Sequence, residues 1–209
     1  MFILSLVKDK LRVDPSRFDL NYDMALENCI HSKYSNKVLP NVGFCICVHD
    51  LTEKGDPYIY PGDGASYSDV KFRLVVFRPG IGEVIRGKVL SCDHRTGIKV
   101  SLGFFTDIYV PPHLLPEGSE FDDGTNLWTW VYQDVSYEYK IGGSFTFKVS
   151  NVQFNSSYTD VETPKVVLKR GQALMDNPRH NSKSMEDTPF VVIGRTNESG
   201  LGMDEWWEQ

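Results

Sequence analysis

The sequence predicts an α+β module followed by a small all-β barrel. Within residues 1–79 the apolar positions repeat first at strand spacing, then at helix spacing, and then again at strand spacing. After the break Phe77-Arg78-Pro79-Gly80 the pattern changes to short alternating segments separated by turn residues. Because a chain of 209 residues, 41% of them hydrophobic, can bury two modest cores, we expect domains at 1–79 and 80–209.

The first module has the order β-α-β-β. Residues 1–13 alternate like a strand, and Asp14-Pro15 then supplies an N-cap and a proline suited to a first helical turn. The helix that follows has one buried stripe, formed by Tyr22, Leu26, Ile30 and Tyr34 with Ala25 and Cys29 beside them. Alternation over 37–51 and 66–77 predicts two further strands. The result is an open, truncated RNP-like α+β module.

A loop rich in proline and glycine joins the last two strands of this module. It runs from Gly55 to Gly64 and contains Asp56, Pro57, Tyr58, Pro61 and Gly62. Proline stiffens such a connection, and Tyr58 and Tyr60 would be exposed on it, which predicts a docking tip. The alternative is a plain connection whose aromatic rings fold back on their own sheet. Composition leaves both interpretations open.

The second domain has the pattern of an OB-fold, S1-like barrel. Strands are predicted at 82–92, 98–105, 107–110, 144–152 and 190–194. In the first of these, Ile85 and Val89 share one face while Arg86 and Lys88 share the other, and Gly87 suits the sharp coiling that closes a barrel. An added aromatic hairpin is predicted over 127–132 and 135–141, and a mobile insertion around 177–187.

The outward face of the barrel combines cations with aromatic rings. By period-2 counting this face holds Arg86, Lys88, Lys99, Phe105 and Lys148, with Tyr109 on the adjacent strand. Single-stranded nucleic acids are bound by base stacking on aromatic rings together with positive charges along the backbone, so we favour RNA contact here. The alternative is a face whose cations only solubilise the barrel while Phe105 packs under a loop.

The charge distribution limits any nucleic-acid contact. The net charge is −6; residues 1–79 are balanced, and residues 80–209 hold the acidic excess. Tight binding to duplex DNA requires many neutralised phosphates, so this balance argues against it and predicts weak, local RNA contact. The apolar runs are far shorter than the roughly 20 residues that span a bilayer, so no membrane partner is expected. The N-terminus reads as a strand rather than a signal peptide, which indicates an intracellular chain.

No catalytic or metal site is predicted. Cys45, Cys47 and His49 alternate on one face of a strand, with Cys29 and His31 on the nearby helix, so a zinc site has to be considered. Strand residues two apart are separated by about 6.6 Å, which is too far for the trio to converge on one ion, so packing is favoured. The motifs of serine hydrolases, zinc proteases and phosphate-binding loops do not occur. We therefore expect no enzyme and no cofactor.

The order of these parts resembles one protein family. The β-α-β-β module, the loop Gly55–Gly64, the junction Phe77-Arg78-Pro79-Gly80-Ile81-Gly82-Glu83-Val84 and the S1-like barrel are similar to the stalk subunit of multisubunit RNA polymerases. This family has an archaeal member and counterparts in the three nuclear polymerases. The ending Gly200-Leu201-Gly202-Met203-Asp204-Glu205-Trp206-Trp207 and the insertion before Phe190 most resemble the RNA polymerase III branch.

The resemblance implies specific partners and a nuclear location. The first module would pair with a smaller helical stalk subunit, and the loop would dock on the RNA polymerase III core through Asp56, Pro57, Tyr58, Pro61 and Gly62. The barrel would face initiation factors and nascent RNA during transcription of tRNA and 5S rRNA genes, with Arg86, Lys88, Lys99, Phe105, Tyr109 and Lys148 as candidate RNA contacts. The competing hypothesis is a free-standing S1-type single-stranded RNA-binding protein of RNA processing or translation.

Overall fold

The computed structural model describes residues 1–155, 165–166 and 188–207 as two compact units. The first unit holds Met1–Arg78 together with the short strand β13 (Lys165–Val166), and the second holds Pro79–Asn155 together with 188–207. The insertion predicted around 177–187 lies outside the described residues. Among the described residues, no helix has both the length and the apolar character needed to cross a membrane.

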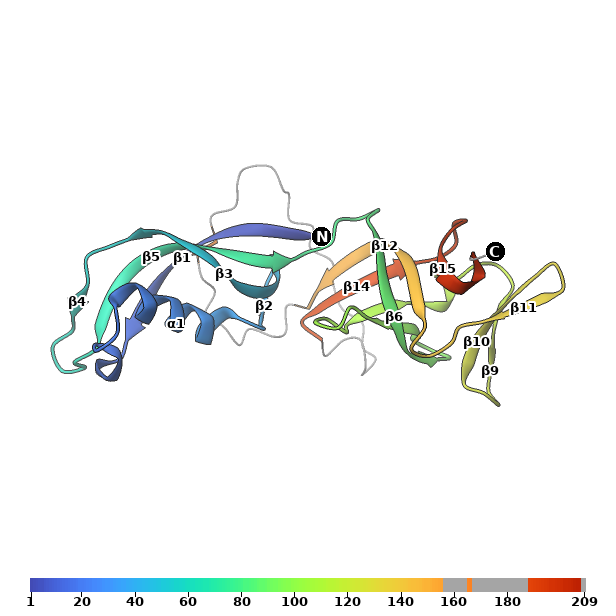
Figure 1. Ribbon diagram of the computed structural model, residues 1–209, viewed down its shortest axis with the longest axis horizontal. Helices are drawn as coiled ribbons and strands as arrows, with labels where there is room; N and C mark the ends of the chain where they lie inside the picture. The colour runs from blue at the N-terminus through green and yellow to red at the C-terminus, as the bar shows by residue number, and fades with distance from the viewer. Residues whose placement is uncertain (156–164, 167–187, 208–209) are drawn as a thin grey trace. The chain divides into compact units, whose positions relative to one another are not determined.

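An antiparallel sheet forms the first unit (Figure 1). Its order is β13-β1-β5-β3-β2, where β1 is Phe2–Val13, β5 is Ser66–Phe77, β3 is Gly43–Lys54 and β2 is Val38–Leu39. The two long strands β1 and β5 pair along their whole length, from Phe2 opposite Phe77 to Val13 opposite Ser66. A further short strand, β4 (Tyr58–Ile59), extends from the loop onto β5. The predicted β-α-β-β order is confirmed.

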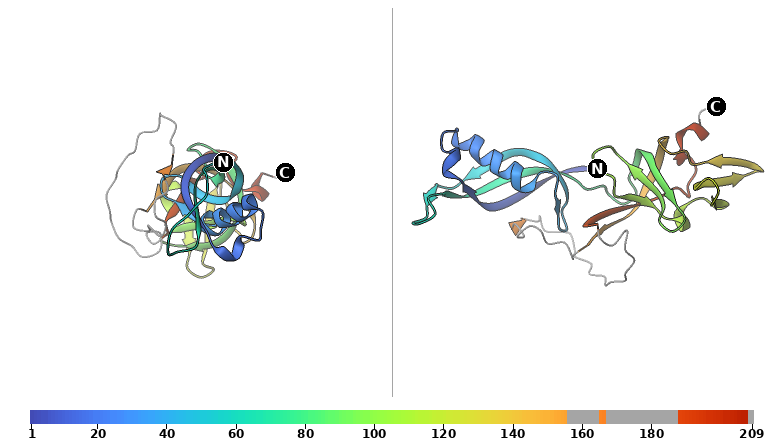
Figure 2. Two further views of the ribbon diagram at one scale, coloured as in Figure 1. Left: turned by 90° about the vertical axis from the view of Figure 1, so that its left-hand side faces the viewer. Right: turned by 90° about the horizontal axis from the view of Figure 1, so that it is seen from below.

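Helix α1 (Tyr22–Tyr34) lies along one face of this sheet and packs on β1 and β3 (Figure 2). Its buried side chains are Ala25, Leu26, Ile30 and Tyr34, while Tyr22 and Cys29 are half-buried against the same core, so the predicted stripe is confirmed. The start of the helix differs from the prediction. Pro15–Arg17 form a separate 3-10 turn, η1, and α1 begins only after Asn21, whose side chain accepts a hydrogen bond from the Asp23 amide.

Strand β3 departs from simple alternation. Its pairing with β5 shifts register three times, between Cys45 and Cys47, between Val48 and Asp50, and between Leu51 and Glu53. Each shift places an extra residue on β3, so Cys45, Val48 and Leu51 face the core at a spacing of three. The expectation that Cys45, Cys47 and His49 share one face is therefore wrong. Within the described ranges there is no group of ligands placed to hold a metal ion.

Five strands of the second unit close into a barrel. They are β6 (Val84–Asp93), β7 (Gly97–Ser101), β8 (Ile108–Val110), β12 (Ser144–Phe154) and β14 (Phe190–Arg195). Pairing runs β14-β8-β7-β6-β12 and returns to β14; only the β8–β14 pair is parallel. This closed order confirms the OB-fold prediction. Gly87 allows the closure, because a Cβ there would lie 2.7 Å from Val100 Cγ1 and 2.9 Å from the Ser101 carbonyl oxygen.

The predicted aromatic hairpin is part of a three-stranded sheet. Strands β10 (Leu127–Tyr132) and β11 (Val135–Glu138) pair through a two-residue turn at Gln133 and Asp134, both of which have positive φ. The sequence did not predict β9 (Ser119–Asp122), which pairs with β10, or the chain's last elements, β15 (Gly202–Met203) and the 3-10 turn η3 (Asp204–Trp206). A third 3-10 turn, η2, covers Pro112–Leu114.

Candidate functional site

The predicted docking loop is fully on the surface of the first unit. All five of its candidate residues are exposed: Asp56, Pro57, Tyr58, Pro61 and Gly62. The short pairing of β4 with β5 sets Tyr58 opposite Tyr67 and Ile59 opposite Ser66. The loop is thus accessible along its length and yet held to the sheet in its middle.

Three tyrosines form a cluster at the base of the loop. The ring of Tyr58 lies 6.1 Å from that of Tyr67, and the ring of Tyr60 lies 5.5 Å from Tyr67, nearly edge to face. The Lys10 ammonium stands 5.4 Å from the centre of the Tyr58 ring. Tyr58 and Tyr60 nevertheless remain 37% and 54% exposed. The rings of the loop therefore fold back on the sheet and still keep part of their surface exposed.

An ion pair closes the far end of the loop. Arg12 on β1 donates to Asp63 from Nε at 2.9 Å and from Nη2 at 2.8 Å, and the Tyr67 hydroxyl donates to the same carboxylate. These hydrogen bonds, of which those from Arg12 have the largest effect, lower the pKa of Asp63 to about 2. Because Arg12 holds both oxygens of the Asp63 carboxylate, it fixes the orientation of this side chain as well as attracting it. The Pro61–Asp63 stretch therefore has a defined position.

The cations of the barrel face are largely neutralised by the chain's own carboxylates. Arg86 forms an ion pair with Asp204, and Lys148 donates to both oxygens of Glu198, at 2.7 and 3.1 Å. Lys99 lies 3.7 Å from Asp107 and 5.2 Å from the centre of the Tyr109 ring. Lys88 is exposed and forms no ion pair with any residue in the described part of the chain. The positive charge available to a phosphate backbone is therefore small.

Two aromatic residues proposed for RNA stacking do not project outward, and that part of the prediction is wrong. Phe105 is 5% exposed and packs on Phe190, with ring centres 5.3 Å apart, while Tyr109 is 6% exposed. For Phe105 the cause is the early end of β7 at Ser101, because Gly103 takes a left-handed φ of 87° and breaks the alternation that the sequence suggested. Tyr109 lies on β8, whose three residues are all buried. Phe104 is the exposed ring instead, at 44%.

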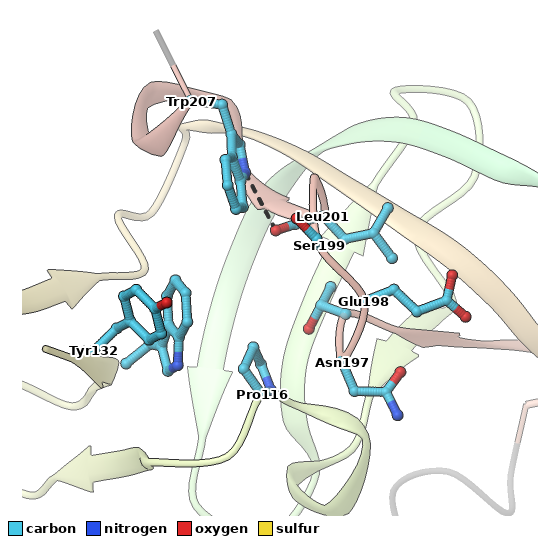
Figure 3. A pocket seen from close by; sticks show the side chains of 9 residues that line it. Pro116, Tyr132, Asn197, Glu198, Ser199, Leu201 and Trp207 are labelled. Atoms are coloured by element: carbon cyan, nitrogen blue, oxygen red, sulfur yellow. Dashed lines mark hydrogen bonds between the residues drawn. The ribbon is translucent and has the colours of Figure 1, made fainter. Parts of the chain in front are cut away.

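The structure assembles an aromatic surface that sequence reasoning found only in part. We use the name aromatic groove for Trp130, Tyr132, Tyr137, Trp206 and Trp207, which line one hollow of about 310 Å³. A second hollow of about 300 Å³ shares Trp130, Tyr132 and Trp207 and continues between Pro116 and the segment 197–201 (Figure 3). The sequence predicted the aromatic hairpin but not its contact with Trp206 and Trp207. Two consecutive tryptophans at the chain's end were the signal that could have placed them beside the hairpin.

Two family models match the chain. Residues 8–64 match the SHS2 domain found in the N terminus of Rpb7p and Rpc25p, and residues 83–207 match RNA polymerase III subunit Rpc25. The first match covers the second half of β1, all of α1, β2 and β3, and the whole docking loop, and the second covers the barrel and the aromatic groove. Strand β5 lies between the two matched ranges.

Two RNA polymerase III subunits match this chain along nearly its full length, and an RNA polymerase II subunit matches part of it. DNA-directed RNA polymerase III subunit RPC8 of Bos taurus is 34% identical over 99% of this chain and 98% of its own length. Its namesake from Saccharomyces cerevisiae is 32% identical over the whole of both chains. RNA polymerase II subunit RPB7 of the same yeast is 30% identical over 60% of this chain and 74% of its own.

Fold and matches together define the class, a stalk subunit of a multisubunit DNA-directed RNA polymerase. The chain belongs to the RNA polymerase III subunit Rpc25 family and is accordingly a stalk subunit of RNA polymerase III. The resemblance predicted from the junction and the C-terminal segment is confirmed.

Proposed function

We propose that this stalk subunit pairs through its first unit with a smaller stalk subunit and docks on the polymerase III core through the loop Gly55–Gly64. Its barrel then contacts initiation factors and, weakly, nascent RNA during transcription of tRNA and 5S rRNA genes in the nucleus. One observation carries the docking proposal: the loop is exposed throughout and yet held in shape by the tyrosine cluster and by the Arg12–Asp63 ion pair. A preorganised loop loses little conformational freedom on binding.

Exposed apolar side chains support a protein partner on the first unit. Around the start of α1, Phe18, Leu20 and Met24 are 45%, 43% and 55% exposed. Clustered apolar surface of this kind is typical of a site that another protein covers. We assign this cluster to the smaller stalk subunit.

The barrel supports protein contact more strongly than RNA contact. Its candidate RNA residues Arg86, Lys99 and Lys148 are ion-paired, and Phe105 and Tyr109 are buried. Lys88 is the strongest remaining candidate for a phosphate contact. A transcript passing this face would therefore be held weakly and released readily as the salt concentration rises.

The test is affinity capture of the tagged full chain from nuclear extract, washed at about 1 M salt to screen non-specific charge contacts. We expect a smaller stalk subunit and polymerase III core subunits to be retained. Replacing Tyr58 and Pro61 together by serine should release the core subunits and keep the small partner, whereas Leu20→Asp with Met24→Asp should release the small partner. Glu53→Ser, exposed just outside the loop, is the matched control. A chain that captures neither partner would overturn the proposal.

A further inference from the structure

The aromatic groove lies on the second unit and contains none of the residues assigned to core docking. It joins the hairpin sheet to the end of the chain: the Trp130 ring lies 5.1 Å from Tyr132 and 5.4 Å from Trp206, and Tyr137 lies 5.7 Å from Trp206. Tyr132 and Trp207 are 51% and 47% exposed. Large aromatic rings that cluster and remain exposed mark a binding surface.

The rings are held in place before any partner arrives. The Trp130 indole N–H donates to the Glu117 carbonyl oxygen at 3.0 Å, and the Trp207 indole N–H donates to that of Leu201 at 3.3 Å (Figure 3). Trp206 packs edge-on against the buried Tyr139, with ring centres 4.7 Å apart. Because the indole N–H groups of Trp130 and Trp207 are satisfied within the protein, these two rings offer their faces to a ligand.

The surroundings of the groove are strongly acidic. From Leu114 to Tyr139 the chain carries six carboxylates, at Glu117, Glu120, Asp122, Asp123, Asp134 and Glu138, and no lysine or arginine. Two further carboxylates at the groove are already paired, Glu205 with Lys140 and Glu198 with Lys148 and Arg195. The excess negative charge repels a phosphate backbone and attracts a cation.

We propose that the aromatic groove binds an extended segment of a protein that presents arginine or lysine side chains. The cationic groups would lie over the ring faces of Tyr132 and Trp207 while the acidic hairpin sheet supplies long-range attraction, since aromatic faces and carboxylates both favour cations. Two adjoining hollows of about 300 and 310 Å³ suit successive side chains of one extended segment. This inference does not depend on docking of the Gly55–Gly64 loop or on RNA contact.

A defined peptide tests the proposal on the full chain. The probe is a fluorescein-labelled peptide of about ten residues with alternating proline and arginine, which stays extended in solution. Matched peptides replace arginine by leucine or by glutamate, and binding is read by fluorescence anisotropy. We expect saturable binding of the arginine peptide, at least about tenfold weaker binding of the leucine peptide, and none of the glutamate peptide.

Variants distinguish binding by the rings of the aromatic groove from simple attraction to the acidic surface. Tyr132→Ala and Trp207→Ala change no charge and remove exposed rings, and each should weaken the arginine peptide about tenfold, whereas Trp207→Phe should retain most of the affinity. Phe104→Ala, which removes an exposed ring elsewhere on the same unit, should leave the affinity unchanged. Circular dichroism confirms that each variant is folded. Three results would each overturn the proposal: equal binding of the leucine peptide, an unchanged affinity for the arginine peptide in both alanine variants, or displacement of the arginine peptide by a short uridine oligonucleotide.

Discussion

Arg12 and Asp63 stand 51 positions apart in the sequence and form a two-point ion pair that ties the docking loop to strand β1. The pair is exposed, so its contribution is to the position of the loop rather than to the stability of the fold. The same carboxylate accepts a hydrogen bond from the Tyr67 hydroxyl, so the tyrosine cluster and the ion pair stabilise one another.

The titration of Asp63 should report on this anchor. Because its pKa is lowered to about 2 in the folded chain, below the ordinary value of about 3.9, the anchor is fully present above pH ~4 and is lost as the pH falls through ~2. Carboxyl-carbon NMR should give a midpoint near 2. Arg12→Ala should move that midpoint upward, whereas Asp56→Asn in the same loop should leave it in place. An unchanged midpoint in Arg12→Ala would show that the ion pair does not form.

Gly87→Ala should strain the barrel. Its Cβ would meet Val100 Cγ1 at 2.7 Å and the Ser101 carbonyl oxygen at 2.9 Å, so strand β6 or β7 must move. Overpacking of this kind typically lowers the free energy of unfolding by about 1–3 kcal/mol. Urea denaturation followed by circular dichroism measures this change in the free energy of unfolding. Gly80→Ala, whose Cβ has no neighbour nearer than 4.0 Å, is the control and should be close to wild type.

Weak RNA binding should depend more on Lys88 than on Lys148. Lys88 is exposed, whereas Lys148 donates to Glu198 and lowers the pKa of that carboxyl. Anisotropy of a labelled uridine oligonucleotide, measured across salt concentrations, gives the slope of log affinity against log salt. Lys88→Ala should reduce that slope by about 0.7, the value for one phosphate contact to a single strand. A larger effect from Lys148→Ala would contradict the pairing seen in the structure.

Cys45 should resist alkylation. It is 0% exposed, and burial, together with neighbouring Cys47, raises the pKa of its thiol to about 12, so little thiolate exists at pH ~8. Iodoacetamide labelling of the native chain, mapped by mass spectrometry, should modify the half-buried Cys47 before Cys45. Labelling in urea should remove the difference. Equal native rates would mean that the bulged strand β3 opens readily.

Local patterns were sufficient for most of the fold. The spacing of Leu26, Ile30 and Tyr34 predicted the buried helix face, and the alternation that puts Ile85 and Val89 on one side of a strand predicted an inward strand face. Such periodicity depends on backbone geometry alone, which a short window of sequence contains. The candidate site was less predictable. Phe105 is buried because one residue, Gly103, turns the chain, and period counting cannot anticipate where a strand stops.

The order of the elements, their buried faces, the OB-type barrel and the polymerase stalk family were thus contained in the amino-acid sequence. Only the tertiary structure determines that Lys148 forms an ion pair with Glu198 and that the Trp206 ring packs on Trp130. Each of these pairs joins segments at least 50 residues apart, and the periodicity of a strand specifies a face without specifying what lies opposite. Charge pairing and ring clustering depend on which distant residues become neighbours, and this is decided only when the chain folds.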